Sequence, residues 1–187
     1  MDRGEVPNLE EKTVSSEEIF DGELLHVRRD IVKLPGGAES VREWIDHPGA
    51  SAVVPIFDDG TTILVRQFRY PARRVFWEVP AGKLDVPGES AEGVARRELE
   101  EETGWRASRF EHVGSFYPCI GYSNEIIHTF VAFDLERGTQ ALSDGELLEP
   151  VRMPFDKAID LVQNGEIVDM KTISALLTAG HYRLSRS

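Results

Sequence analysis

The chain has 187 residues, 41% of them hydrophobic and 29% charged, which is typical of one globular domain or of one domain with a small addition. Its longest apolar run, Ala52 to Phe57, is too short for a membrane-spanning helix, and its acidic N-terminus lacks the apolar segment of a signal peptide. The single cysteine, Cys119, excludes an internal disulfide framework, and the net charge of -12 argues against nucleic-acid binding, so we predict a cytoplasmic protein that binds neither a membrane nor a nucleic acid.

The N-terminal part predicts a small β-unit. The first ~20 residues are polar and receive no assignment. Residues 24–34 and 39–46 are β-rich and flank Pro35-Gly36-Gly37, a pattern typical of a β-hairpin. His47-Pro48-Gly49 interrupts the pattern. We therefore predict a boundary between an N-terminal antiparallel β-unit, residues 1–47, and a main domain, residues 48–187.

Strands and helices follow one another in the main domain without a regular alternation. Residues 82–89 form an expected loop, after which Ser90 is expected to cap a helix and Gly104 to end it. Asp169 is expected to cap the last helix. This mixture predicts an α+β fold with a mixed sheet. The expected strands cover residues 52–57, 62–68, 76–79, 112–116, 126–133 and 147–153, and the expected helices residues 91–103, 156–164 and 170–181.

The first of these helices carries carboxylates on its apolar face. On a helical wheel, Glu101 and Glu102 fall within about 60° of Glu98, on the side of the apolar residues, whereas Glu100 points the other way. Carboxylates that face a protein interior need cations or a metal ion, and oxygen ligands at this spacing suit Mg²⁺ or Mn²⁺. A solvated, Glu-rich helix end would give the same pattern, so the helix alone leaves both interpretations open.

The residues around this helix resemble the Nudix box, Gly-x5-Glu-x7-Arg-Glu-U-x-Glu-Glu-x-Gly-U, in which U is a bulky apolar residue. Gly82 opens the motif, Glu89 follows, and the segment from Arg97 to Trp105 closes it with every fixed position filled. Six residues rather than five separate Gly82 from Glu89, an insertion that lies in the loop and leaves the helical register unchanged. The resemblance implies a Nudix α/β/α sandwich with a mixed sheet, preceded by the small antiparallel β-unit.

Carried over residue by residue, the resemblance implies a divalent-metal site with Mg²⁺ as the cofactor and Mn²⁺ as a substitute. Such ions neutralise and align a diphosphate and acidify a bound water. Arg97 would orient the carboxylates by ion pairing, and Glu89 would support them. Arg97 and Glu101 are accordingly included among the catalytic residues. The implied metal ligands are Glu98 and Glu102, then Glu101, with the backbone carbonyl of Ala81.

Other segments are similar to the branch of this family that hydrolyses ADP-ribose and other nucleoside diphosphate sugars. In that branch, the second arginine of an Arg-Gln-Phe-Arg segment contacts the substrate phosphates. The corresponding residue here is Arg69, whose guanidinium suits a bidentate phosphate contact. The segments that carry the similarity are residues 65–69, 78–82, 144–146 and 165–172.

Branch members are homodimers whose N-terminal β-units exchange across the interface and help to hold the nucleobase. Arg42 and Glu43 lie where base-contacting residues are expected, and His47 lies near a second phosphate contact. Strand alternation puts Arg42 and Glu43 on opposite faces. Trp44 can stack on a base, although a buried core or interface position is the more common role of tryptophan. The resemblance therefore implies a homodimer with a nucleoside diphosphate sugar as its substrate.

Two loops complete the implied site. In the segment of residues 117–125, Gly121 would allow close approach of the backbone and Glu125 would be a carboxylate beside the substrate. Ile120 stands where branch members commonly have a proline. The catalytic base of the branch lies on the loop before the last strand, where Glu146 is the best match and Asp144 the second.

The resemblance predicts a metal-dependent pyrophosphohydrolase that cleaves ADP-ribose to AMP and ribose 5-phosphate. Two alternatives remain open. The first is another nucleoside diphosphate sugar, such as GDP-mannose or ADP-glucose. The second is a Nudix-fold sensor that binds its ligand without hydrolysis, although the intact set of metal residues favours the enzyme.

Overall fold

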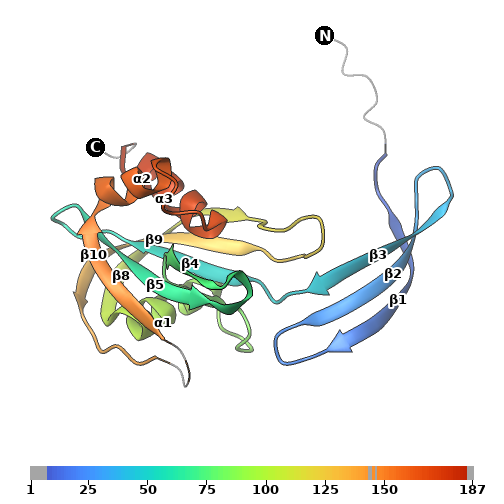
Figure 1. Ribbon diagram of the computed structural model, residues 1–187, viewed down its shortest axis with the longest axis horizontal. Coiled ribbons are helices and arrows are strands. Elements are labelled where there is room, and N and C mark those ends of the chain that lie inside the picture. Colours follow the sequence, from blue (N-terminus) through green and yellow to red (C-terminus); the bar gives the residue numbers. More distant parts are fainter. Residues whose placement is uncertain (1–7, 143–144, 146, 185–187) are drawn as a thin grey trace, which may run out of the picture. The chain divides into compact units, whose positions relative to one another are not determined.

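The computed structural model describes residues 8–142, 145 and 147–184, and the chain divides into two compact units. The first unit comprises the described residues up to His47 together with Cys119–Glu125, and the second comprises Pro48–Pro118 with the residues from Ile126 onward. Each unit has its own sheets (Figure 1). The first contains strands β1 (Lys12–Asp21), β2 (His26–Lys33) and β3 (Glu39–Asp46).

The first unit is an antiparallel sheet of order β1-β2-β3. The predicted hairpin at Pro35-Gly36-Gly37 is confirmed: Leu34 and Ala38 close the turn with a 2.8 Å backbone hydrogen bond, and Gly37 has a φ of 89°. β1 was not assigned from the sequence because most of its residues are polar and its apolar residues show no regular alternation. All ten of its residues are exposed, so the strand has no buried face that would require apolar residues at alternate positions.

The segment Cys119–Glu125 joins the first unit through β3 and the residue that follows it. The Ile45 N–H donates to the Tyr122 carbonyl at 2.8 Å, and the His47 N–H donates to the side-chain oxygen of Asn124 at 2.7 Å. The Asn124 side chain also donates to Asp46 at 3.0 Å. Residues far apart in the sequence are therefore held together at the end of β3.

Within its described residues, the second unit has two sheets, three helices and a short 3-10 turn at Tyr70–Ala72. One sheet is mixed and has the order β7-β4-β9-β8, with β4 and β9 parallel and the other pairs antiparallel. The other is antiparallel with the order β10-β5-β6. Its elements are β4 (Ala50–Pro55), β5 (Thr61–Arg69), β6 (Arg74–Glu78), β7 (Ala81–Lys83), α1 (Ala91–Thr103), β8 (Trp105–Phe116), β9 (Ile127–Arg137), β10 (Leu148–Pro154), α2 (Phe155–Gln163) and α3 (Met170–Leu184).

Alternate residues of the central strands face two separate apolar cores. Val53 of β4 and Phe130 of β9 pack in a cluster with Leu99 of α1. The neighbouring residues Val54 and Val131 pack in a second cluster, which contains residues of α2 and α3. Helices therefore cover both faces of the mixed sheet (Figure 1), and the predicted α+β sandwich with an N-terminal antiparallel unit is confirmed. No helix of the described residues is long and apolar enough to cross a membrane.

One strand of the second unit, β7, was not predicted, and another, β8, was predicted too short. Residues 82–83 were expected in a loop, but Ala81–Lys83 form β7 and pair with Ala50–Ala52 of β4. β8 begins at Trp105 rather than near residue 112. Its first half alternates half-buried and exposed residues only as far as Ser108, and the pattern breaks where Arg109 is also exposed, so the strand signal there is short although the backbone pairs with β9.

The predicted caps of α1 and of the start of α3 are confirmed, whereas α3 continues to Leu184, three residues beyond its predicted end. The Ser90 hydroxyl accepts a hydrogen bond from the Gly93 N–H at 3.0 Å, and α1 ends at Gly104 with a φ of 71°. The Asp169 carboxylate accepts a hydrogen bond from the Thr172 N–H at 3.0 Å at the start of α3. These caps fix the register of α1, and with it the direction of its carboxylates.

Candidate active site

Arg97 lies at the centre of a cluster of carboxylates on α1 and the loop before it. Its Nη1 donates to Glu98 at 2.7 Å and to Glu101 at 3.0 Å, and its Nε and Nη2 donate to Glu89 at 3.2 Å. The hydrogen bonds to Glu89 and the charge of Glu98 raise the pKa of Arg97 above its ordinary value. These ion pairs are the ones that the predicted orienting role of Arg97 requires.

The Glu98 carboxylate lies directly against β7. A Cβ atom at Gly82 would lie 1.8 Å from Glu98 Oε1 and 2.2 Å from its Cδ, closer than atoms can approach. Only glycine therefore allows the carboxylate to occupy this place. Gly82 follows Ala81, whose carbonyl is the predicted backbone ligand, so the structure brings this part of β7 and Glu98 together.

Glu102 is the most buried of the α1 carboxylates, with 4% of its surface exposed, whereas the Glu101 side chain is 35% exposed. Glu100 binds Arg106 at 2.6 Å and lies near the Thr139 backbone, which confirms that it points away from its neighbours. In the part of the chain that the structure describes, no three His, Cys, Asp or Glu side chains converge as a metal site. The predicted ligand set contains three such side chains, Glu98, Glu101 and Glu102, beside the Ala81 carbonyl, and the structure does not gather these three into one group. Arg97 instead binds Glu98 and Glu101.

Arg69 lies at the end of β5 and its guanidinium is bound by Glu78 at the end of β6. Arg69 Nε and Nη2 each donate to one oxygen of Glu78 at 2.7 Å, a bidentate ion pair. Lys171 of α3 also donates to Glu78, at 3.1 Å. The predicted phosphate-binding arginine is therefore 48% exposed at its side chain but anchored to a carboxylate of which only 5% is exposed.

Arg69, Glu78 and Lys171 form a second cluster, in which opposite charges stabilise the ionised forms of Arg69 and Glu78. The hydrogen bond to Glu78 is the main cause of the raised pKa of Arg69, and the charges of Glu78, Glu102 and Asp169 add to it. Burial would raise the pKa of Glu78, but the hydrogen bond from Arg69 and the charge of Lys171 outweigh burial, and the pKa is lowered. Glu78 is thus ionised at neutral pH, and the charge of Glu102 acts on Arg69.

The remaining described site residues lie in the first unit, where each has a local partner or turn. Arg42 donates to Glu11 at 2.9 and 2.5 Å, and Glu43 accepts from Arg29 at 2.9 Å. The backbone N–H of Glu125 donates to the Ser123 hydroxyl at 3.1 Å, and the backbone of His47 is bound to Asn124 as described above. Around Gly121 a Cβ atom would meet nothing within 4 Å, so no contact in the chain requires glycine there.

The predicted alternation of β3 is confirmed by its partners on β2. Trp44 donates from its indole nitrogen to Asp30 at 2.9 Å, and on the same face Asp46 accepts from Arg28 at 3.2 Å. Glu43, on the other face, pairs with Arg29. Trp44 is half-buried and bound within its own sheet.

Asp144 and Glu146, the predicted bases, lie outside the described residues. Sequence reasoning missed Glu78 and Lys171 as contributors to the site. Glu78 was detectable as an acidic residue at the inner end of an apolar strand, residues 75–79. Lys171 gave no such signal, because it lies 93 residues from Glu78 and only the fold brings the two side chains together.

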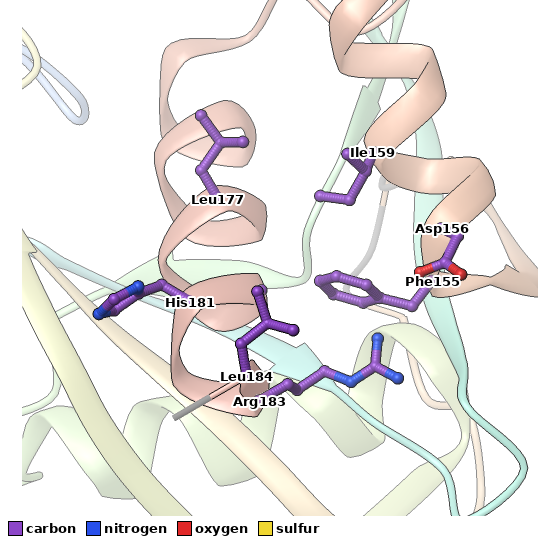
Figure 2. A pocket seen from close by; sticks show the side chains of 8 residues that line it. Phe155, Asp156, Ile159, Leu177, His181, Arg183 and Leu184 are labelled. Atoms are coloured by element: carbon purple, nitrogen blue, oxygen red, sulfur yellow. The ribbon is translucent and has the colours of Figure 1, made fainter. Parts of the chain in front are cut away.

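A hollow of about 470 Å³ lies elsewhere, between α2 and α3 (Figure 2). Ile159 and Leu177 line it together with Phe155 and Leu184, and Arg183 stacks on the Phe155 ring at 4.6 Å. None of the predicted site residues lines it, and its lining is mostly apolar.

Comparison with known proteins agrees with this arrangement. Residues 46–176 match the NUDIX domain family, and residues 11–45 match the family described as nucleoside diphosphate sugar hydrolase N-terminal domain. A solved structure of an ADP compounds hydrolase superposes with a TM-score of 0.85 and 23% identity, covering 97% of this chain and 99% of the other, which shows that the fold is shared.

Curated relatives are similar over most of their length. An ADP-ribose pyrophosphatase of Bacillus subtilis is 41% identical over 171 residues, 90% of this chain and 92% of the relative. A methanol dehydrogenase activator of Bacillus methanolicus is 38% identical, covering 90% of this chain and 91% of the relative. A GDP-mannose pyrophosphatase of Yersinia enterocolitica is 33% identical, covering 74% of this chain and 76% of the relative. The acidic helix lying on a glycine, its arginine-centred ion pairs and these matches together assign the chain to the NUDIX family of hydrolases.

Proposed function

We propose that the chain hydrolyses the diphosphate of ADP-ribose to AMP and ribose 5-phosphate. The observation that carries the proposal is the contact of Glu98 with Gly82, because it puts an inner carboxylate of α1 beside the backbone of the motif that opens at this glycine. The similarity to an ADP-ribose pyrophosphatase over 90% of the chain supports this substrate.

Nudix hydrolases need divalent metal ions, and we propose Mg²⁺ here, with Mn²⁺ as a substitute. Carboxylates and a carbonyl are the hard oxygen donors that these ions prefer. The Ala81 carbonyl, Glu98 and Glu102 would hold the ion, with Glu101 as the next ligand. When bound, the ion supplies charge neutralisation of the diphosphate and acidification of a water.

The protein's own cations have separate tasks in this proposal. Arg97 keeps Glu89, Glu98 and Glu101 in one arrangement, since its guanidinium bonds to all three. Arg69 binds the substrate phosphate with its exposed edge. Glu146, with Asp144 as the second candidate, takes the proton of the attacking water and stays a prediction from the sequence, as does the cytoplasmic location.

The first unit would bind the nucleobase side of the substrate. Arg42 and Glu43 would contact the base, and His47 a phosphate. Gly121 and Glu125 would line the site from the segment that β3 holds. We propose that the protein is a homodimer in which a second copy of the chain covers exposed residues of the first unit.

The exposed apolar residues of the β1–β3 sheet support the proposed homodimer. Val14 and Phe20 of β1 are each 56% exposed, and a second copy of the chain would remove their apolar surface from water. We expect the double variant Val14→Lys, Phe20→Lys to raise the dimer dissociation constant by about tenfold or more in analytical ultracentrifugation. Ser16→Lys, on the same strand, is the control. A monomeric wild type, or a double variant that dimerises like the wild type, would contradict the homodimer.

Phosphate release in the presence of added phosphatase tests the substrate. We expect Mg²⁺-dependent release from ADP-ribose, with a lower rate for GDP-mannose, ADP-glucose, NADH and diadenosine polyphosphates. A preference for GDP-mannose would support the alternative that the Yersinia relative suggests. Binding of a sugar nucleotide without any release would instead support a ligand sensor.

A further inference from the structure

Glu78 binds two cationic side chains, Arg69 of β5 and Lys171 of α3. Its Oε2 atom accepts from Arg69 Nη2 at 2.7 Å and from Lys171 Nζ at 3.1 Å. Its whole residue is 3% exposed. Lys171 in turn lies 3.1 Å from Asp169, and its side chain is 14% exposed. The four side chains form a chain of alternating charge, Arg69, Glu78, Lys171 and Asp169.

The Arg69 guanidinium depends on this chain for its position. In the β5–β6 register Arg69 lies opposite Arg74, whereas Glu78 lies opposite Val65, four residues back along β5. This offset of four residues corresponds to about 13 Å along the strand, so the Arg69 and Glu78 side chains must both extend toward each other to form the ion pair. A long side chain held only at its head loses its position when the head is released.

The ion pair also determines which edge of the guanidinium a ligand can meet. Glu78 occupies the Nε and Nη2 edge. A phosphate can then bind the other edge, which Nη1 forms with the outer N–H of Nη2. Lys171 binds the same Oε2 atom of Glu78 as Arg69 does, and so it helps to fix the carboxylate that orients the guanidinium.

Asp169 pairs with Lys171 as well as with the start of α3, so the four side chains together carry no net charge, and Lys171 acts through the position of Glu78. Asp169 accepts hydrogen bonds from the backbone N–H of Thr172 at 3.0 Å and from its hydroxyl at 2.6 Å. The positive end of the α3 dipole lies at the same place. Asp169 therefore binds both the start of α3 and Lys171, and Lys171 in turn binds Glu78.

We propose that Lys171 is a positioning residue of this hydrolase: it holds the Glu78 carboxylate in place, so that Arg69 keeps the position from which it binds the substrate diphosphate. This inference rests on the proposed function, because it requires Arg69 to bind phosphate. It adds a residue of α3 that touches neither the substrate nor the metal ligands.

The test compares Lys171→Met, which keeps the length of the side chain without its charge, with Lys171→Arg, which keeps the charge. We expect Lys171→Met to raise the KM for ADP-ribose about tenfold while kcat and the Mg²⁺ concentration for half-maximal rate change less than about threefold. Lys171→Arg should recover most of the loss. Lys157→Met, an exposed lysine of α2, is the matched control. A KM within twofold of the wild type would overturn the proposal.

A double-mutant cycle separates positioning from a general structural effect. Because Lys171 acts through Arg69, Lys171→Met should have little further effect on KM in an Arg69→Gln background. Equal effects on KM in both backgrounds would overturn the proposal. A Lys171→Met variant whose kcat falls as strongly as its KM rises would also overturn it. If Lys171→Met fails to fold, the KM of Lys171→Gln and its coupling to Arg69→Gln decide in the same way.

A binding measurement keeps this inference distinct from the proposed function. Calorimetric titration with the α,β-methylene analogue of ADP-ribose in Mg²⁺ should show about tenfold weaker binding by Lys171→Met. A wild type that binds the analogue without hydrolysing ADP-ribose would overturn the proposed function but leave the positioning role to be decided by the variant's affinity. A wild type that neither binds nor hydrolyses would overturn both.

Discussion

Glu102→Gln is expected to lower kcat by about 100-fold or more, the size of effect that follows the loss of one fixed charged group around a reacting phosphate or carbonyl. Glutamine has the same shape, so the buried face of α1, where Glu102 is 4% exposed, keeps its packing. The charge that it removes is one that would hold the divalent ion and that also acts on Arg69. Steady-state turnover of ADP-ribose at several Mg²⁺ concentrations measures the effect.

Glu100→Gln is the matched control, because Glu100 belongs to the same turn of α1 but is paired with Arg106 on its other side. We expect turnover within about twofold of the wild type for this variant. Circular dichroism and the thermal unfolding midpoint show whether both variants are folded. Unchanged turnover in a folded Glu102→Gln protein would show that Glu102 is not a ligand.

Gly82→Ala is expected to raise the Mg²⁺ concentration for half-maximal rate by about 10- to 100-fold, the range found when residues that orient metal ligands are replaced. The added methyl group would lie 1.8 Å from Glu98 Oε1, so the carboxylate has to leave its place against β7. The clash involves the end of a flexible side chain, so we expect the free energy of unfolding to change by no more than about 1 kcal/mol. A metal titration of the rate tests the first expectation and thermal denaturation the second.

Gly36→Ala provides the comparison for this variant, since a Cβ atom there would meet nothing within 4 Å. It should leave the metal dependence unchanged. If Gly82→Ala had the metal dependence of the wild type, the position of Glu98 against β7 would have no part in metal binding.

The helix with the acidic residues was predictable because several independent signals agree at the same residues. Ser90, Gly104 and the apolar positions between them fix both ends and the buried face of α1, and the structure has the helix at Ala91–Thr103. Local signals of this kind act within a few residues, so they can be recognised without knowing the fold. The burial of Glu102 and the opposite direction of Glu100 follow from the same helical geometry.

The second cluster could not be predicted in this way, because its members come from three elements, and α3 lies more than 90 residues from β5 and β6. Arg69 was expected to be an exposed guanidinium ready for a phosphate, but one of its edges is bound to Glu78. Only the pairing of β5 with β6 and the packing of α3 bring Arg69, Glu78 and Lys171 together. β1 was missed for a different reason: its residues are all exposed within the chain, so the sequence has no buried face to reveal.

The hydrogen bond between the Val79 N–H and the Thr172 hydroxyl has a consequence for the order in which the protein folds. It joins residues 93 positions apart, at 3.0 Å, immediately before the strand that carries Ala81 and Gly82. Contacts of such long sequence separation form only after a large loop has closed, which makes them slow. During synthesis, α1 and its carboxylates can form early, but the end of β6 gains this anchor only when α3 has left the ribosome and docked. The nascent chain therefore gains its acidic helix well before it gains the cation cluster that would bind the diphosphate.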